Sequence, residues 1–323
     1  MLKADLHCHS IYSEHPADWF LQKLGARESY TDPFYIYDRA IQKGMDLVCI
    51  TDHNRIEGAL LLKEKHPSKV ITGVESTAYF PEDGCKIHIL IYGLNEEQFE
   101  TINLVRKDIY ELRSYLLENE LTHSVAHASY QVNGKLKQEH LEKLILLFDV
   151  FESHNGGRNV LNNLGWKHIL DHMDANRIEA LYQKHRIEPA SDEPWIKGYT
   201  GGSDDHAGIF VGSTYTQVQA ANQAEFLEAI RAKQGTGFGR HNDFHSLAFT
   251  IYKVAYDFSK QQSSKKKENP LLTSVTEALF ENRSLDLGNR LKIRTMRGLA
   301  DIRGDELKKN LAELLNTLNN SRD

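Results

Sequence analysis

The sequence has no long hydrophobic run. The longest uninterrupted apolar stretch is LILLF at residues 144–148, far short of the roughly 20 residues that a membrane-spanning helix needs. Near the start, Lys3 and Asp5 interrupt the residues from which the apolar part of a secretory signal would have to form. We therefore expect neither a membrane span nor a signal peptide.

Cysteine is scarce, with three copies at Cys8, Cys49 and Cys85. An odd number without any CxxC pair offers neither a disulfide framework nor a four-thiolate zinc site. Because free thiols persist in a reducing compartment, we expect a cytoplasmic protein.

An excess of positive charge is also missing, since the formal net charge is −6 at pH 7. Basic residues outnumber acidic ones by 13 to 9 in residues 260–323 (+4), which leaves 26 against 36 (−10) in residues 1–259. A broad nucleic-acid footprint needs clustered Lys and Arg. The composition therefore argues against nucleic acid as a partner and suits a protein whose carboxylates are offset by bound cations.

Two common catalytic motifs are absent. The chain contains no GxxxxGK[ST], which argues against a P-loop NTPase, and no GxSxG, which argues against a serine hydrolase. The pair His168 and His172 has the i, i+4 spacing of metal ligands, but Ile169 stands where a zinc protease needs glutamate. We interpret that pair as a solvated helix face.

The first 240 residues alternate β-like runs with helical patterns, which indicates a parallel sheet or barrel. The expected strands cover residues 3–7, 46–51, 69–75, 86–92, 124–126, 149–153 and 199–203. A helix is expected from Pro33 to Gly44, and one long helix after Asn95 that carries a stripe from Phe99 to Leu116. Residues 79–85 predict a hairpin turn, and GTGFG at 235–239 a plain turn.

The C-terminal part differs in composition from the rest. Residues 261–270 (QQSSKKKENP) predict a linker, so we divide the chain into a barrel of residues 1–258 and an extension of residues 259–323. The extension ends in an amphipathic helix with Leu307, Leu311, Leu314 and Leu318 on one face. We expect this helix to pack on its own domain, with self-association as the alternative.

Histidine is abundant, with 16 copies, and several of them end predicted strands. His7 and His9 lie two apart, so both imidazoles point to one face of a strand. Other predicted strands end in, or contain, His53, Glu75, His88, His127, Asp204 and His206. Polar residues at strand ends cost stability unless something pairs with them. One cluster of divalent metal ions explains all of them together.

These motifs, DLHCHS, ITDHN, GVES, KIHIL, VAHAS and GGSDDH, resemble those of the PHP (polymerase and histidinol phosphatase) family of metal-dependent phosphoesterases. The resemblance covers residues 5–206 and implies a distorted (β/α)7 TIM-like barrel. It also implies two or three divalent ions, and sites of histidine and carboxylate ligands accept Zn²⁺, Mn²⁺ or Fe²⁺. One ion would be held by His7, His9, Glu75 and Asp204; a second by the bridging Glu75, His88 and His127; a third by His53 and His206.

The third ion needs one more ligand, and here the chain departs from the family pattern. Where many relatives have Ser-Asp-Gly, this chain has Ser13, Glu14 and His15. Either Glu14 or His15 is expected to complete the site, and the spacing does not choose between them.

The resemblance implies hydrolysis of a phosphate ester on a small metabolite by a metal-bridged hydroxide. We predict His154 as the proton donor to the leaving group and Arg158 as a bidentate grip on the phosphate. Arg240 is a weaker candidate for the second role. A solvated histidine and surface arginines are the plainer interpretations of these residues.

Three other functions stay open at this point. The first is an exonuclease, as in polymerase-linked members of the family, although the acidic body disfavours it. The second is an amidohydrolase, a class that also begins with HxH on a barrel strand. The third is a metal-stabilised scaffold or regulatory subunit without catalytic activity.

Overall fold

The computed structural model describes residues 1–13 and 27–263. It is a mixed α/β structure in which one sheet runs in the order β7-β6-β5-β4-β3-β2-β1-β8-β9. The strands are β1 (Leu2–Asp5), β2 (Leu47–Ile50), β3 (Val70–Tyr79), β4 (Lys86–Tyr92), β5 (Thr122–Val125), β6 (Val150–Asn155), β7 (Gly198–Gly202), β8 (Thr214–Val218) and β9 (Thr236–Gly239).

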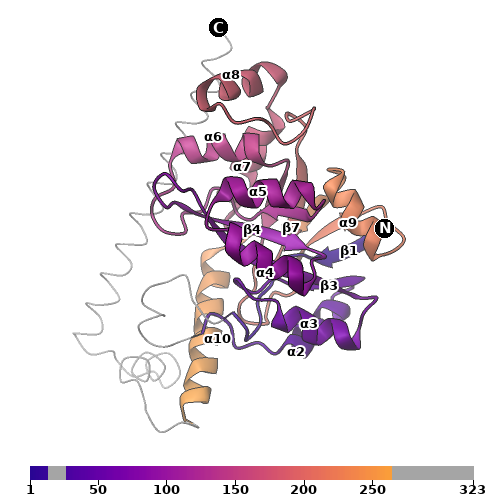
Figure 1. The fold of residues 1–323 in the computed structure, drawn as a ribbon. Helices are drawn as coiled ribbons and strands as arrows, with labels where there is room; N and C mark the ends of the chain where they lie inside the picture. Colours follow the sequence, from indigo (N-terminus) through magenta and orange to yellow (C-terminus); the bar gives the residue numbers. More distant parts are fainter. Residues whose placement is uncertain (14–26, 264–323) are drawn as a thin grey trace, which may run out of the picture.

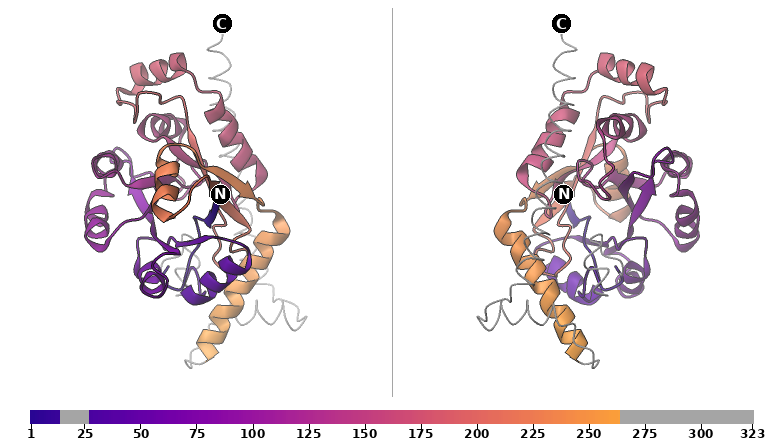
Figure 2. Two further views of the ribbon diagram at one scale, coloured as in Figure 1. Left: turned by 90° about the vertical axis from the view of Figure 1, so that its right-hand side faces the viewer. Right: turned by 90° about the vertical axis from the view of Figure 1, so that its left-hand side faces the viewer.

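Helices cover the outside of this sheet (Figures 1 and 2). They are α2 (Pro33–Gln42), α3 (Glu57–Lys65), α4 (Glu96–Val105), α5 (Ile109–Glu118), α6 (Gln138–Leu147), α7 (Val160–Asp171), α8 (Ala175–His185), α9 (Gln223–Arg231) and α10 (Phe244–Ser263). Within the described residues, no helix is long and apolar enough to cross a membrane.

The sheet curves into a nearly closed barrel. Beyond the carboxyl ends of β1 and β7, the Asp204 amide donates to the His7 carbonyl, and the His9 amide donates to the Asp205 carbonyl. Nearer its start, β1 pairs with β8 in antiparallel fashion, and its opposite side pairs with β2. The carboxyl ends of strands far apart in sequence therefore meet on one side of the barrel.

The expectation of a seven-stranded parallel barrel is met only in part. The seven predicted runs are strands, but β3, β4 and β5 pair in antiparallel fashion, and β8 and β9 bring the sheet to nine strands. The hairpin predicted at residues 79–85 is confirmed. The plain turn predicted at GTGFG is wrong, because this segment is β9. A Cβ on Gly237 would lie 2.8 Å from the Thr200 carbonyl oxygen, so glycine lets β9 approach β7 closely.

The predicted helix that starts after Asn95 is two helices. The Asp108 side chain accepts the Tyr110 amide and starts α5, and the Arg106 side chain donates to the Thr77 carbonyl at the break. Such side-chain bonds compete with a continuous helix. The apolar stripe continues across the break, since Phe99, Ile102, Ile109, Leu112 and Leu116 are all buried.

The predicted α2 is confirmed, with Asp32 capping its first turn and Pro33 at its first position. Gly44 follows it with φ of +79°, a conformation that favours glycine.

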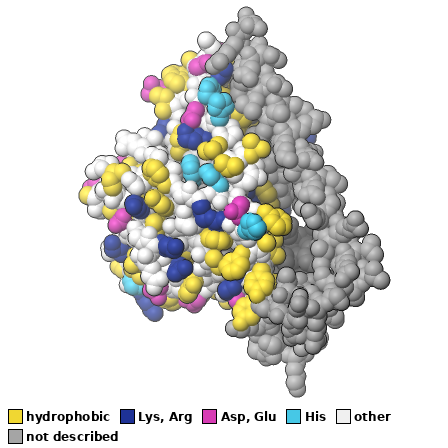
Figure 3. Space-filling view, turned by 180° about the vertical axis from the view of Figure 1, so that it is seen from behind, with side chains coloured by type: hydrophobic (Ala, Val, Ile, Leu, Met, Phe, Trp, Pro, Cys, Tyr) yellow, Lys and Arg dark blue, Asp and Glu magenta, His cyan; other side chains and the backbone are white. Residues whose placement is uncertain are grey.

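The last described helix, α10, extends beyond the body of the barrel (Figure 2). It continues to Ser263, past the expected domain boundary at residue 258. Val254 and Phe258 are buried, whereas Phe244, Phe249 and Ile251 are exposed. Apolar side chains gather on the lower part of the face drawn in Figure 3. The predicted leucine-rich helix at 307–318 lies outside the described residues.

Candidate metal centre

Eight of the predicted metal ligands converge at one place in the barrel. His7 and His9 follow β1, His53 follows β2, Glu75 lies in β3, His88 in β4, His127 follows β5, and Asp204 and His206 follow β7. Their ligand atoms form four groups of three in which all atoms lie within 4.8 Å of one another. The groups are His9, His53 and His206; His7, His127 and Asp204; His7, His9 and Glu75; and His53, Glu75 and His88.

Glu75 lies at the centre of this cluster and is fully buried. One of its oxygens, Oε2, lies 3.2 Å from His7 Nε2, from His9 Nε2 and from His53 Nδ1. The other, Oε1, lies 2.7 Å from His88 Nδ1 and 3.1 Å from His127 Nε2. One carboxylate therefore contacts five imidazoles, with each oxygen facing a different subset.

Asp204 is a second carboxylate in the cluster. Its Oδ1 lies 3.5 Å from His7 Nε2 and 3.6 Å from both His9 Nε2 and His206 Nδ1. Its backbone has a positive φ of 49°, and so does that of His127, at 27°. Residues other than glycine rarely adopt a positive φ, and the residues that do so are concentrated at functional sites.

Glu28 is a third carboxylate, which the sequence reasoning missed. Its Oε2 lies 3.1 Å from His53 Nε2, and its Oε1 lies 3.2 Å from His206 Nε2. Glu28 thus places a carboxylate beside His53 and His206, and the prediction of Glu14 or His15 as a ligand falls on residues outside the described part of the chain. Glu28 follows no predicted strand and belongs to no recognised motif, so the sequence carried no signal for it.

Several polar atoms of the cluster are buried without a hydrogen bond in the described structure. They include His7 Nε2, His9 Nε2, His88 Nδ1 and Glu75 Oε2. Unpaired buried polar atoms cost free energy, and imidazole nitrogens together with carboxylate oxygens are the donor set of Zn²⁺, Mn²⁺ and Fe²⁺. These residues therefore fit divalent metal ions.

Two further buried carboxylates orient the imidazoles of the HxH motif through Nδ1, the ring nitrogen that faces away from the cluster. Glu152 Oε1 lies 2.9 Å from His7 Nδ1, and its Oε2 accepts the His127 amide at 3.0 Å. Asp52 accepts the Ser13 hydroxyl, which in turn lies 3.1 Å from His9 Nδ1. Such contacts leave the opposite nitrogen, Nε2, of His7 and His9 facing the cluster.

These two carboxylates were also missed as functional residues. A signal for both existed, because Asp52 directly precedes His53 and Glu152 lies two residues before His154. Asp52 follows β2 and Glu152 lies in β6, as the predicted ligands follow or lie in their strands.

The cluster has an unusual electrostatic balance. Burial opposes ionisation of Glu75, but His53, His88 and His7 hold its pKa well below the usual range. Burial alone would lower the pKa of His9, yet the neighbouring carboxylates of Asp204 and Glu75 raise it to about 10. Burial lowers the pKa of His88 to about 4. The central carboxylate is thus ionised at neutral pH, as metal binding requires.

Arg158 lies beside the cluster. Its Nη2 is 3.4 Å from Asp204 Oδ2, its guanidinium carbon stacks 3.7 Å from the centre of the Tyr130 ring, and its buried Nε has no partner in the described structure. A cavity of about 100 Å³ opens here, lined by Arg158, Asp204 and His206 among others. Arg240 stacks on Phe210, which also lines this cavity.

His154 is not brought into the cluster. Its ring stacks on His241 with 5.0 Å between centroids, and its Nδ1 lies 3.4 Å from the Ser153 hydroxyl. Its role as proton donor stays a prediction, and this geometry lends it no support. His168 and His172 lie with ring centroids 4.1 Å apart on the exposed surface of α7 and at its end, in keeping with a solvated helix face.

Comparison with known proteins adds little to this geometry. No protein-family model matches the chain. A stretch of 63 residues is 41% identical to uncharacterized protein MJ1587 of Methanocaldococcus jannaschii; the match covers 20% of this chain, and this chain spans only about a third (35%) of that protein.

Solved structures with a similar fold include three proteins. PsfC from Pseudomonas syringae is 14% identical with a TM-score of 0.44, covering 80% of this chain and 98% of its own. A proposed metal-dependent phosphoesterase from Bifidobacterium adolescentis is 15% identical with a TM-score of 0.38, covering 75% and 97%. A sulfate-bound, metal-free amidohydrolase from Chromobacterium violaceum is 14% identical with a TM-score of 0.41, covering 63% and 87%.

At these identities and TM-scores, the resemblances assign no activity to this chain. The described residues themselves show a mixed α/β barrel with a buried set of imidazoles and carboxylates that fits divalent metal ions.

Proposed function

We propose that this protein is a metal-dependent phosphoesterase of the PHP type that hydrolyses a phosphate ester of a small metabolite. The observation that carries the proposal is the central position of Glu75. Because each of its two oxygens faces a different group of imidazoles, one carboxylate is placed to bridge two cations.

The ligands divide among three sites in this proposal. His7, His9 and Asp204 join Glu75 on one side, and His88 and His127 join it on the other. His53, His206 and Glu28 would hold a third ion. When bound, adjacent divalent ions supply an acidic water and neutralise charge on the phosphoryl oxygens.

The chain's own residues bind and orient the phosphate. The guanidinium of Arg158 faces the small cavity beside Asp204, and its planar fork matches two phosphate oxygens. Stacking on Tyr130 holds the guanidinium plane in place.

The arginine favours a phosphoester over an amide or lactone. A cation with an unpaired Nε beside a cavity of about 100 Å³ fits a compact anion better than a neutral acyl group. An amidohydrolase remains the second candidate, because its chemistry uses the same imidazole and carboxylate donors.

The test is elemental analysis of the purified protein, combined with a panel of aryl and metabolite phosphates supplied with Mn²⁺, Zn²⁺ or Fe²⁺. We expect bound metal and phosphate release, and we expect Arg158→Gln to raise KM by about 10-fold or more. Turnover of an amide or lactone without phosphate release would favour the amidohydrolase. Salt-sensitive cleavage of single-stranded DNA would favour the exonuclease, and bound metal without hydrolysis would favour the scaffold.

A further inference from the structure

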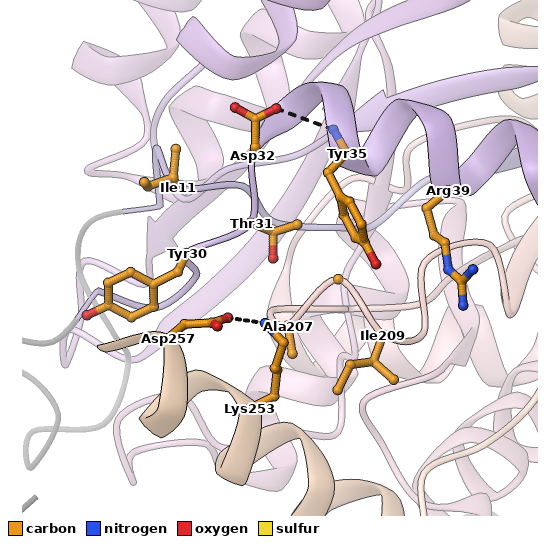
Figure 4. A pocket seen from close by; sticks show the side chains of 11 residues that line it. Ile11, Tyr30, Thr31, Asp32, Tyr35, Arg39, Ala207, Ile209, Lys253 and Asp257 are labelled. Carbon is orange, nitrogen blue, oxygen red and sulfur yellow. Dashed lines mark hydrogen bonds and ion pairs between the residues drawn. The ribbon is translucent and has the colours of Figure 1, made fainter. Parts of the chain in front are cut away.

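A second and larger cavity, of about 660 Å³, lies between α2, α10 and the loop after β7 (Figure 4). Its volume falls in the range of small-molecule sites, roughly 300–1,000 Å³. Tyr35 and Arg39 face it from α2, and Lys253 and Asp257 face it from α10, while Ile209 lies at the loop.

This cavity borders the metal centre along the chain. Three lining residues closely follow cluster residues in sequence: Ile11 follows His9, Tyr30 follows Glu28, and Ala207 follows His206. The Ile11 amide also donates to the Thr31 carbonyl, which ties two of these loops together. Three loops that carry cluster residues therefore continue directly into the lining of this cavity.

The cavity is lined by two cations, Arg39 and Lys253, and two carboxylates, Asp32 and Asp257, so its formal charges cancel, but they are not all paired with one another. Lys253 forms an ion pair with Asp257 across one turn of α10. Asp32 accepts the amides of Phe34 and Tyr35 at the start of α2. Arg39 has no acidic partner among the described residues: its Nη1 donates to the neutral side chain of Gln42, and its Nε is buried without a hydrogen bond.

An apolar surface lies next to this unpaired cation. Tyr35 is 52% exposed, and it lies one helical turn before Arg39, so both side chains project from the same face of α2. Ile209 lies at the loop side of the cavity (Figure 4). The combination suits a flat organic group that ends in an anion.

Building on the proposed function, we propose that this cavity receives the alcohol part of the phosphate ester and that Arg39 binds a second anionic group on it. The substrate is then a phosphomonoester of a molecule that carries a further carboxylate or phosphate. Tyr35 and Ile209 contact the body of that molecule, and the hydrolysed phosphate lies at the metal centre.

The first experiment compares two isosteric substrates with the Mn²⁺-loaded protein. One is 4-carboxyphenyl phosphate, and the other is its neutral analogue 4-carbamoylphenyl phosphate. We expect kcat/KM to favour the carboxylate by about 10-fold or more, because a hydrogen bond between charged groups is strong. Arg39→Gln should abolish that preference by lowering kcat/KM for the carboxylate ester, and Arg39→Lys should keep part of it.

The control variant is Lys63→Gln, which removes a cation from the last turn of α3 and should not change the preference. A third substrate, 1,4-phenylene bisphosphate, distinguishes a phosphate from a carboxylate as the favoured second anion. Equal kcat/KM values for all three esters with the wild-type protein would overturn the proposal.

A binding experiment separates this inference from the proposed activity. Calorimetry measures the affinity of 4-carboxybenzylphosphonate and of its neutral carbamoyl analogue, neither of which carries a hydrolysable ester. If no phosphate ester is hydrolysed but the carboxylate still binds more tightly in an Arg39-dependent way, the activity is wrong and the cavity assignment stands. If esters are hydrolysed and Arg39→Gln changes neither affinity, the cavity assignment is wrong and the activity stands.

Discussion

Histidines gather in two settings in the described molecule, and the two differ in what surrounds them. Around Glu75, six imidazoles lie among three carboxylates. Elsewhere, His154 pairs with His241, and His168 with His172. Histidine side chains also reach the surface on the face drawn in Figure 3.

The pKa values of His154 and His9 illustrate how the surroundings of a histidine affect its charge. Burial, together with the charges of His241 and Lys167, lowers it to about 4, whereas carboxylates raise the pKa of buried His9 to about 10. Burial therefore keeps the His154 imidazole neutral, as it does His88 within the cluster, whereas His9 is held protonated by its carboxylates. Imidazoles around a shared carboxylate form a site with an anionic centre, and that centre attracts cations.

The largest loss of metal content and activity is expected when the central carboxylate is removed. We expect Glu75→Gln to lose at least one bound ion per chain and more than about 100-fold in phosphatase activity, since even residues supporting metal ligands contribute 10–100-fold. Elemental analysis and phosphate release measure both effects. Glu142→Gln is the control, because Glu142 is equally buried but pairs with Lys184 and His185 instead. Unchanged metal content in Glu75→Gln would refute the central role of this residue.

A smaller loss is expected from Glu152→Gln, which leaves the ligands themselves intact. The change weakens the contact that orients His7 and the bond to the His127 amide, so metal affinity should fall by about 10- to 100-fold. Competition with a chromogenic chelator measures this affinity. A wild-type dissociation constant would show that packing alone holds these imidazoles.

His154, outside the cluster, should instead affect the stability of the protein at acid pH. Because the pKa of His154 is about 4 when folded and about 6.5 when unfolded, protonation favours the unfolded chain. Its contribution to stability is therefore lost as pH falls from about 6.5 towards 4. We expect His154→Gln to flatten this part of the curve of melting temperature against pH.

The exposed His168→Gln serves as the control for that curve and should follow the wild type. An identical acid profile for His154→Gln and the wild type would mean that His154 is not held neutral by its surroundings.

The smallest effect on metal content and activity is expected from the histidines at the end of α7. Replacing His168 and His172 together by alanine should leave both metal content and phosphatase activity within about twofold of the wild type. Among the described residues, neither histidine belongs to a group of three side chains that could hold a metal ion. Loss of one bound ion would instead identify this pair as a metal site.

Local signals in the sequence predicted much of the fold. Strand ends were visible because apolar runs stop abruptly at polar residues, as at Thr51 and Asp52. The cap at Asp32 and the hairpin before Lys86 depend on neighbouring residues alone, so their local chemistry was sufficient. The break between α4 and α5 was missed because the apolar period continues across it.

The residues of the candidate site likewise divide into those that the sequence indicated and those that it did not. The types of residue and their order along the chain were sufficient to indicate eight ligand positions, because the carboxyl ends of barrel strands meet at one edge. Glu28 could not be found in this way, since it follows no strand and reaches His53 and His206 only through the path of the folded chain.

The amino-acid sequence by itself therefore determined seven of the nine strands and which imidazoles and carboxylates stand at or near their ends, since both follow from short-range periodicity and side-chain chemistry. The tertiary structure alone decided that Glu75 lies at the centre, that Glu152 and Asp52 support the imidazoles, and that His154 stays outside. Distances of a few ångströms between residues tens or hundreds of positions apart depend on strand register and barrel closure, which no local pattern encodes.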